Sequence, residues 1–191
     1  IELKSGEITA LFDLAFEIIR ALPARLDNRS TAQRGYALAA RIEPAPVKAS
    51  TPPLSADMSV EDAFAAVALH CLAHLQDNEI GLLAGRDPEY LHQARVALRR
   101  LRSAFRLFDA AMPGLRSARI LDELKPVGRL LGDARDLDVF VLETLPRAGS
   151  AQQAGVAALR RRAQNARRRA TAAVRAAIAA PEYPAMMLRL A

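Results

Sequence analysis

Apolar residues recur at intervals of three and four along most of the chain after residue 58, which is the spacing of amphipathic helices. Ser59 is a typical helix start, whereas Gly85 and the pair Gly132-Asp133 are typical breaks. Because the connections between the helices are short, neighbouring helices should pack antiparallel in a bundle. The predicted helices cover residues 60–84, 88–112, 115–131, 134–145 and 150–180, with a last fragment from residue 184.

The N-terminal part follows a different pattern. Ile1 to Lys4 alternates apolar and polar residues as a strand does, the spacing from Leu11 to Leu22 predicts a helix, and residues 26–38 predict a turn and a second short strand. The next residues contain four prolines among small residues, which predicts that this segment is an extended linker. We therefore expect an all-α fold with three parts. These are a small strand-and-helix remnant at 1–42, a Pro-rich linker at 43–58 and an antiparallel helical bundle at 59–191.

One predicted helix carries a row of basic side chains. Its members lie at helical offsets 0, 3, 7, 10 and 14, within about 80° of one another, and form a stripe about 20 Å long at about 1.5 Å per residue. Leucine, alanine and phenylalanine form a second stripe beside it, which can face the core. A row of cations this long suits a linear polyanion better than a compact ligand. The stripe consists of His92, Arg95, Arg99, Arg102 and Arg106.

The charge distribution supports an anionic partner. The chain has 27 basic and 21 acidic side chains, and residues 86–175 alone hold 18 arginines and Lys125 against 9 acids. A guanidinium binds phosphate through a planar fork and stays charged when partly buried. A solvated basic surface without a ligand is the alternative. The single Cys71 cannot form an internal disulfide, which favours a reducing, cytoplasmic location. No signal peptide or membrane-spanning run is visible.

Several other polar residues are of types that bind metal ions or act in catalysis. His70 and His74 are one helical turn apart and could share a metal ion, but the spacing matches no metalloprotease signature, and a hydrogen-bonded core or anion-facing role is the alternative. Asp133, Asp136 and Asp138 are better explained as helix caps and arginine partners than as a cation site, with Asp136 holding an arginine of the preceding helix. We expect no metal site and no catalytic residue. The absence of aromatic residues between the arginines disfavours RNA.

Two stretches resemble one known family. DPEYLHQARVALRRLRSAFRLF (87–108) and LKPVGRLLGDARDLDVF (124–140) resemble the CHAD family of conserved-histidine α-helical domains, over roughly residues 59–190. The resemblance implies a helical fold that binds inorganic polyphosphate through a basic surface. Such domains usually have two related halves, and only one is visible here; a truncated sequence, a lost half or pairing of two chains in a homodimer would explain this. The implied ligand contacts are His92, Arg95, Arg99, Arg102, Arg106, Lys125, Arg129 and Arg135, joined by His74 and Asn78 from the preceding helix.

The N-terminal residues resemble another family. IELKSG (1–6) and RSTAQRGYALA (29–39) resemble the end of CYTH or triphosphate-tunnel domains, in which Glu2 and Lys4 would be tunnel residues. One strand cannot build a tunnel, so we expect the chain to be no enzyme and to need no cofactor. The predicted function is polyphosphate binding in the cytoplasm, with association to polyphosphate granules implied by the resemblance. The alternatives are a metal-dependent triphosphatase or polyphosphatase with an upstream tunnel domain, and a nucleic-acid binder.

Overall fold

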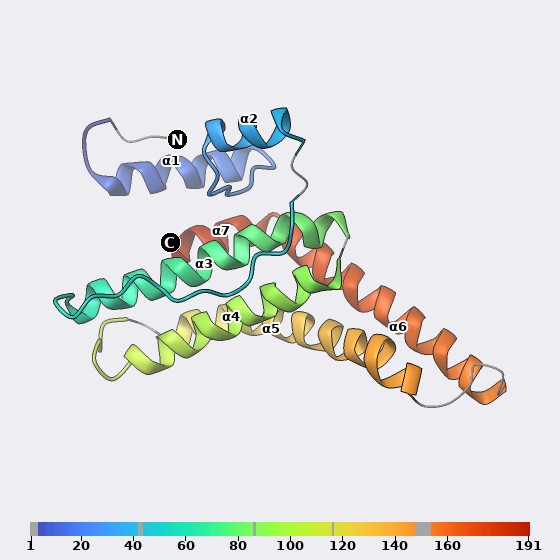
Figure 1. The fold of residues 1–191 in the computed structure, drawn as a ribbon. Coiled ribbons are helices and arrows are strands. Elements are labelled where there is room, and N and C mark those ends of the chain that lie inside the picture. Colours follow the sequence, from blue (N-terminus) through green and yellow to red (C-terminus); the bar gives the residue numbers. More distant parts are fainter. Residues whose placement is uncertain (1–3, 42–43, 86, 116, 148–153) are drawn as a thin grey trace.

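The computed structural model of the chain describes residues 4–41, 44–85, 87–115, 117–147 and 154–191 (Figure 1). All regular secondary structure in these residues is helical, which confirms the all-α prediction. The helices are α1 (Ile8–Ala21), α2 (Thr31–Ala39), α3 (Val60–Ala84), α4 (Pro88–Phe108), α5 (Ser117–Val139), α6 (Ala154–Ala179) and α7 (Glu182–Leu190), with a π-helical turn at Phe140–Thr144 and a 3-10 turn at Leu145–Arg147.

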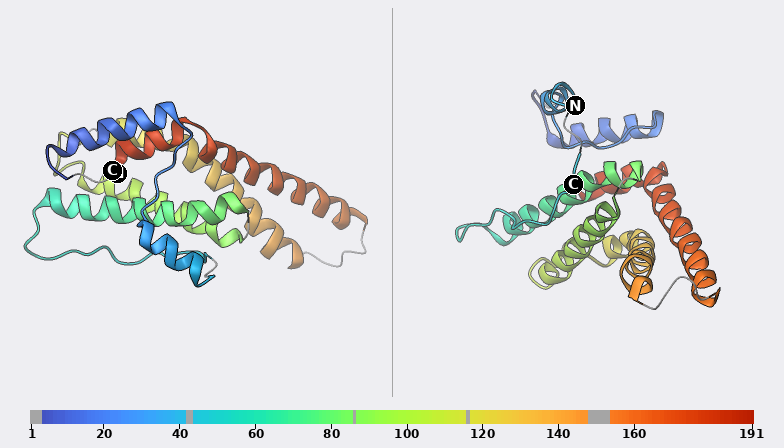
Figure 2. Two further views of the ribbon diagram at one scale, coloured as in Figure 1. Left: turned by 90° about the horizontal axis from the view of Figure 1, so that it is seen from above. Right: turned by 45° about the vertical axis from the view of Figure 1, so that its right-hand side comes forward.

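Helices α3 to α6 pack in chain order, each against the next, and α7 folds back beside α3 (Figures 1 and 2). Their apolar faces share one core, to which α3 contributes Leu75, α4 Leu101, α5 Leu131, α6 Ile178 and α7 Met187. Each of these side chains is at most 2% exposed. The core therefore fixes the relative positions of all five helices, and with them the polar side chains on their outer faces.

Local signals explain the limits of α3 and α4. The hydroxyl of Ser59 accepts a hydrogen bond from the backbone N–H of Asp62, and Gly85 ends α3 with a φ of 69°. The carboxylate of Asp87 then caps α4, whose first residue is a proline. Both helix starts and the end of α3 agree with the sequence pattern.

Two predicted elements are wrong. The break at Gly132-Asp133 does not exist, because α5 continues through it to Val139. Gly132 is buried where α4 crosses α5, so its role is close packing and not helix termination. The second predicted strand is instead helix α2, which Ser30 and Gln33 start with a reciprocal capping box. The predicted strand at 1–4 lies outside the described residues except for Lys4, which is exposed.

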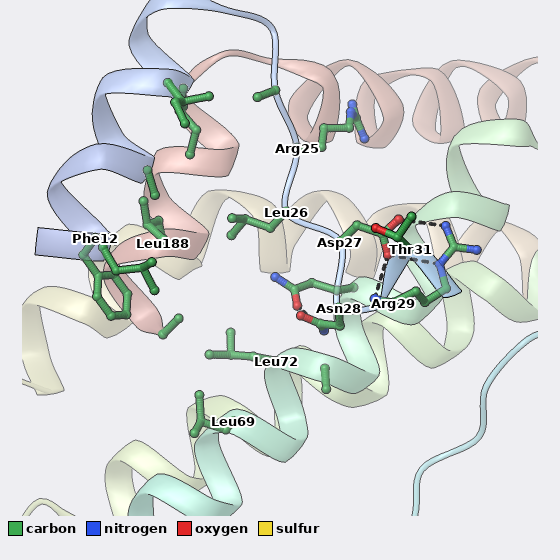
Figure 3. A pocket seen from close by; sticks show the side chains of 18 of the residues that line it. Phe12, Arg25, Leu26, Asp27, Asn28, Arg29, Thr31, Leu69, Leu72 and Leu188 are labelled. Atoms are coloured by element: carbon green, nitrogen blue, oxygen red, sulfur yellow. Dashed lines mark hydrogen bonds and ion pairs between the residues drawn. The ribbon is translucent and has the colours of Figure 1, made fainter. Parts of the chain in front are cut away.

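Helices α1 and α2 form a separate layer on the side of α3 and α7 that faces away from α4 and α5 (Figures 1 and 2). No residue of either helix is buried. The predicted helix that Pro23 follows corresponds to α1. A cavity of about 710 Å³ lies beneath α1, with Phe12 and Leu188 on one side and Leu69 and Leu72 on the other (Figure 3). None of the helices in the described ranges is long and apolar enough to cross a membrane.

Candidate polyanion-binding face

The basic stripe lies on the outer side of α4. Leu98 and Leu101 on the neighbouring apolar side are buried in the core, and this orientation keeps the stripe at the surface. Arg99 and Arg106 are exposed, while His92, Arg95 and Arg102 are half-buried. The structure therefore holds the five predicted basic residues together on one side of a single rigid helix.

Two glycines of α5 provide space for the half-buried arginines. A Cβ atom at Gly132 would lie 2.6 Å from Nη1 of Arg95, and one at Gly128 would lie 3.4 Å from Nη1 of Arg102. Both guanidiniums therefore extend from α4 across the surface of α5. Gly128 and Gly132 are one helical turn apart, so they mark one face of α5.

Helix α5 adds cations beside these glycines. Lys125 and Arg129 are exposed and lie within one turn of Gly128, on the side of α5 that borders the stripe. Lys125 bonds Asp122 at 2.5 Å, but both side chains are solvent-exposed, so this ion pair is weak. We call the stripe together with Lys125 and Arg129 the cationic face. Arg135 lies further along α5, is half-buried and contacts Glu143 at 3.4 Å.

The arginines of the cationic face have no carboxylate partner in the described part of the chain. The arginines that form ion pairs among the described residues lie elsewhere. One of them is Arg167, which contacts the buried carboxylate of Asp138 at 2.5 Å. Asp136, which the sequence analysis assigned as an arginine partner, is exposed and forms no ion pair with a described residue. That prediction is wrong, because Asp138 is the carboxylate that reaches a neighbouring helix. The cap role of Asp133 is also wrong, because α5 continues through this residue and no helix begins there. The unpaired arginines are Arg95, Arg99, Arg102, Arg106 and Arg129.

Two buried atoms of the stripe lack hydrogen-bond partners among the described residues. They are Nε of Arg102 and Nδ1 of His92. A buried donor without an acceptor costs free energy, and an oxygen of a bound anion would supply the acceptor that Arg102 lacks. The face therefore combines aligned positive charge with unsatisfied hydrogen-bonding capacity.

His74 and Asn78 are not on the cationic face. Both are buried on α3, where His74 Nε2 lies 2.9 Å from the carbonyl oxygen of Val47 and Asn78 bonds the same residue. Both residues were predicted to join the stripe as ligand contacts, but in the structure the linker covers them. Burial is the main cause that lowers the pKa of His74. In the described ranges, no group of three or more His, Cys, Asp or Glu side chains is placed to hold a metal ion.

Two features of this region were not predicted from the sequence. Arg100 was left out because it lies off the stripe, yet its Nη2 donates to the carbonyl of Ser50 at 2.7 Å. The glycine pair of α5 was also missed, since Gly132 was assigned to a helix break. The signal for it was the four-residue spacing of Gly128 and Gly132 within a helical pattern, which is typical of close helix packing.

The fold is an antiparallel helical bundle, and one of its faces carries arginines that no carboxylate of the described residues pairs with. Residues 66–191 match the family model of the CHAD domain, so the chain belongs to the CHAD family. It is also similar to the crystal structure of the CHAD domain from the plant Ricinus communis, with 40% sequence identity and a TM-score of 0.68. That similarity covers 76% of this chain and 49% of the plant chain, so this chain spans about half of that length. No curated protein matches.

These comparisons confirm the resemblance based on residues 87–108 and 124–140. The family match begins at residue 66, so the resemblance of the N-terminal residues to triphosphate-tunnel domains remains a prediction.

Proposed function

We propose that this domain binds inorganic polyphosphate along the cationic face. The observation that carries the proposal is the row of arginines that α4 holds in line and that have no carboxylate partner among the described residues, with Arg95 and Arg102 against the glycines of α5. A linear polyanion can contact several of these guanidiniums at once, which a single phosphate cannot. Membership of the CHAD family supports this choice of ligand.

Multivalent electrostatics is the proposed mechanism. Each arginine that contacts a phosphate displaces condensed counterions from the polymer, so affinity should fall steeply as salt rises. A longer polymer contacts more of the face and can bind in more registers, so affinity should also rise with chain length. Similar affinity for tripolyphosphate and for a long chain would contradict this mechanism.

The proposal is binding without turnover, in the cytoplasm and at polyphosphate granules, with a homodimer as the way to supply a second helical half. Release of phosphate by this chain in the presence of Mg²⁺ or Mn²⁺ would instead favour the triphosphatase alternative. Competition between RNA and polyphosphate at equal phosphate concentration tests the nucleic-acid alternative, and we expect polyphosphate to displace RNA.

The decisive experiment removes two charges from the face. Replacing Arg99 and Arg102 by alanine should weaken long-chain polyphosphate binding at least about tenfold and reduce its salt dependence, because each lost guanidinium removes one phosphate contact. The matched control replaces Arg20 and Arg169, which are exposed on α1 and α6, and changes the net charge equally. If both double variants lose the same affinity, net charge and not the cationic face determines binding, and the proposal fails.

A further inference from the structure

The linker does not run free through solvent. Residues 44–50, which we call the strap, have no regular secondary structure and lie along α3 and α4. Every third carbonyl of the strap accepts a hydrogen bond from these helices. The bonds are Tyr90 Oη to Pro44 O at 2.5 Å, Asn78 Nδ2 to Val47 O at 3.0 Å and Arg100 Nη2 to Ser50 O at 2.7 Å. A repeat of three is that of an extended polyproline II chain, so the strap presents one row of oxygens to the helices.

Two imidazoles approach the same row of oxygens. His74 Nε2 lies 2.9 Å from Val47 O, and His70 Nε2 lies 3.0 Å from Ser50 Oγ and 3.2 Å from Ser50 O. In the other direction, the backbone N–H of Val47 donates to Asn78 Oδ1 at 3.1 Å. The helices thus present a line of hydrogen-bond donors, and backbone oxygens of the strap accept these hydrogen bonds.

The strap offers no negative charge to the positively charged Arg100. Arg100 has no carboxylate partner among the described residues, and its Nη1 is buried without a hydrogen bond there. The only charged side chain of the strap is Lys48, which is itself a cation. The guanidinium therefore bonds to a neutral carbonyl, whereas a phosphate would also neutralise its charge and could accept two parallel hydrogen bonds from it.

The covered donors border the cationic face. Arg99 of the stripe and Arg100 are consecutive on α4, about 100° apart around the helix, and the side chains between them in the adjacent turns are the short ones of Val96 and Ser103. Without the strap, basic residues would extend around α4 from the border with α5 to the border with α3. The strap therefore limits how many of the basic residues of α4 are open to a ligand.

We propose that the strap is an intramolecular plug, and that a long polyphosphate chain bound to the cationic face displaces it and then contacts Arg100, His70 and His74. This inference rests on the proposed function. The tethered strap has a high effective concentration at its site, so a short oligomer that binds the stripe gains too little to displace it. A long chain already bound at Arg99 extends onto the neighbouring donors at little further entropic cost. The plug thus makes the second group of contacts depend on polymer length.

Hydrogen exchange at the Val47 amide tests the plug directly in the wild-type chain. This amide is protected by Asn78, although residues around it are exposed, so NMR can follow it as a single probe. Saturating long-chain polyphosphate should accelerate its exchange at least about tenfold, whereas saturating tripolyphosphate should leave it unchanged. Protection that persists with long-chain polyphosphate bound would overturn the plug and leave the proposed function intact.

A pair of proline substitutions in the strap tests the same inference through affinity. Among the described residues, Val47→Pro removes the one backbone N–H that the strap donates to the helices, while proline suits the extended conformation. With the strap weakened, long-chain polyphosphate should bind about fivefold more tightly, since one hydrogen bond less opposes it. Ala49→Pro is the matched control, because the Ala49 amide makes no hydrogen bond in the described part of the chain, and its affinity should equal that of wild type.

A third variant helps to distinguish failure of the plug from failure of the proposed polyphosphate binding. Replacing His70 and His74 by alanine in the Val47→Pro background should remove the gain for long chains and leave tripolyphosphate binding unchanged. An unchanged affinity of Val47→Pro for long chains would contradict the plug. Absence of any polyphosphate binding by the wild-type chain would instead contradict the proposed function, which the Arg99 and Arg102 variant tests independently.

Discussion

Two glycines on the same face of α5 leave different amounts of room for the arginines above them. A Cβ at Gly132 would come within 2.6 Å of Arg95 Nη1, whereas one at Gly128 would meet Arg102 Nη1 at 3.4 Å and Leu98 Cδ2 at 3.5 Å, which are ordinary contacts. The first glycine therefore sets the position of a guanidinium. The second is compatible with a methyl group.

Gly132→Ala should weaken polyphosphate binding, by about threefold, because the flexible end of Arg95 must move away from α5 and loses its alignment with the stripe. Gly128→Ala should leave binding unchanged and stabilise the protein by up to about 1 kcal/mol, the helix preference of alanine over glycine. Urea unfolding and a binding titration of both variants check this. Equal affinity of Gly132→Ala and wild type would show that Arg95 does not need its position against α5.

At the residue scale, the helical spacing was sufficient to predict which basic side chains share a face. It could not predict how far each one reaches, because that depends on the partner helix and its glycines. His74 and Asn78 show the same limit. Their place on α3 was clear, but only the path of the strap determines that backbone atoms of Val47 cover them.

At the scale of elements, helix limits that depend on local chemistry were predicted well. Ser59 and Gly85 bound α3 as expected, because a side-chain cap and a positive φ act within a few residues. The continuous α5 was missed because Gly132 serves a contact with another helix. Likewise α2 was missed, since its signal is the short capping box of Ser30 and Gln33 in a segment of low apolar periodicity.

Helices α3 and α7 are joined in the core by one polar contact that should make stability depend on pH. Tyr183 Oη of α7 donates a hydrogen bond to the Glu79 carboxyl of α3. Burial raises the pKa of Glu79 from 4.5 to about 7, and the bond from Tyr183 and the charge of Arg25 oppose this only in part. A carboxyl whose pKa is higher in the folded state holds its proton more tightly there. Its stabilising contribution is therefore full below pH 4.5 and declines until pH reaches about 7.

Glu79→Gln keeps an acceptor for Tyr183 and cannot ionise. We expect it to equal wild type in stability at low pH and to exceed it above pH 7 by up to about 3 kcal/mol, at about 1.4 kcal/mol per pH unit. Urea unfolding between pH 4.5 and 8 measures the difference. Glu61→Gln, in the exposed first turn of the same helix, should keep the wild-type pH dependence over this range. Parallel curves for Glu79→Gln and wild type would show that Glu79 is ionised in the folded protein at neutral pH.

At the scale of the whole molecule, the layers differ in how firmly they are packed. Helices α3 to α7 share the apolar core, and the strap is bound to α3 and α4 by several hydrogen bonds. Helix α1 buries no residue and lies above the cavity of about 710 Å³ (Figure 3). The segment after it is tied to the bundle by Arg25, which donates to Ile178 O at 3.3 Å, and by Asn28, which bonds Gln76.

Hydrogen exchange should therefore rank the layers in a fixed order. Amides of α1 and α2 should exchange first, because helices of 14 and 9 residues without buried side chains are marginally stable on their own and can unfold without opening the core. Amides of α4 should exchange last, by global unfolding, so that a destabilising core variant such as Leu101→Ala accelerates them and leaves α1 unchanged.

Because α1 lies on the opposite side of α3 from the cationic face, bound polyphosphate should slow exchange in α4 and leave α1 as it was. Protection of α1 equal to that of α4 would show that the N-terminal layer unfolds together with the bundle, and slower exchange of α1 with ligand would show that the two sides of the molecule are coupled.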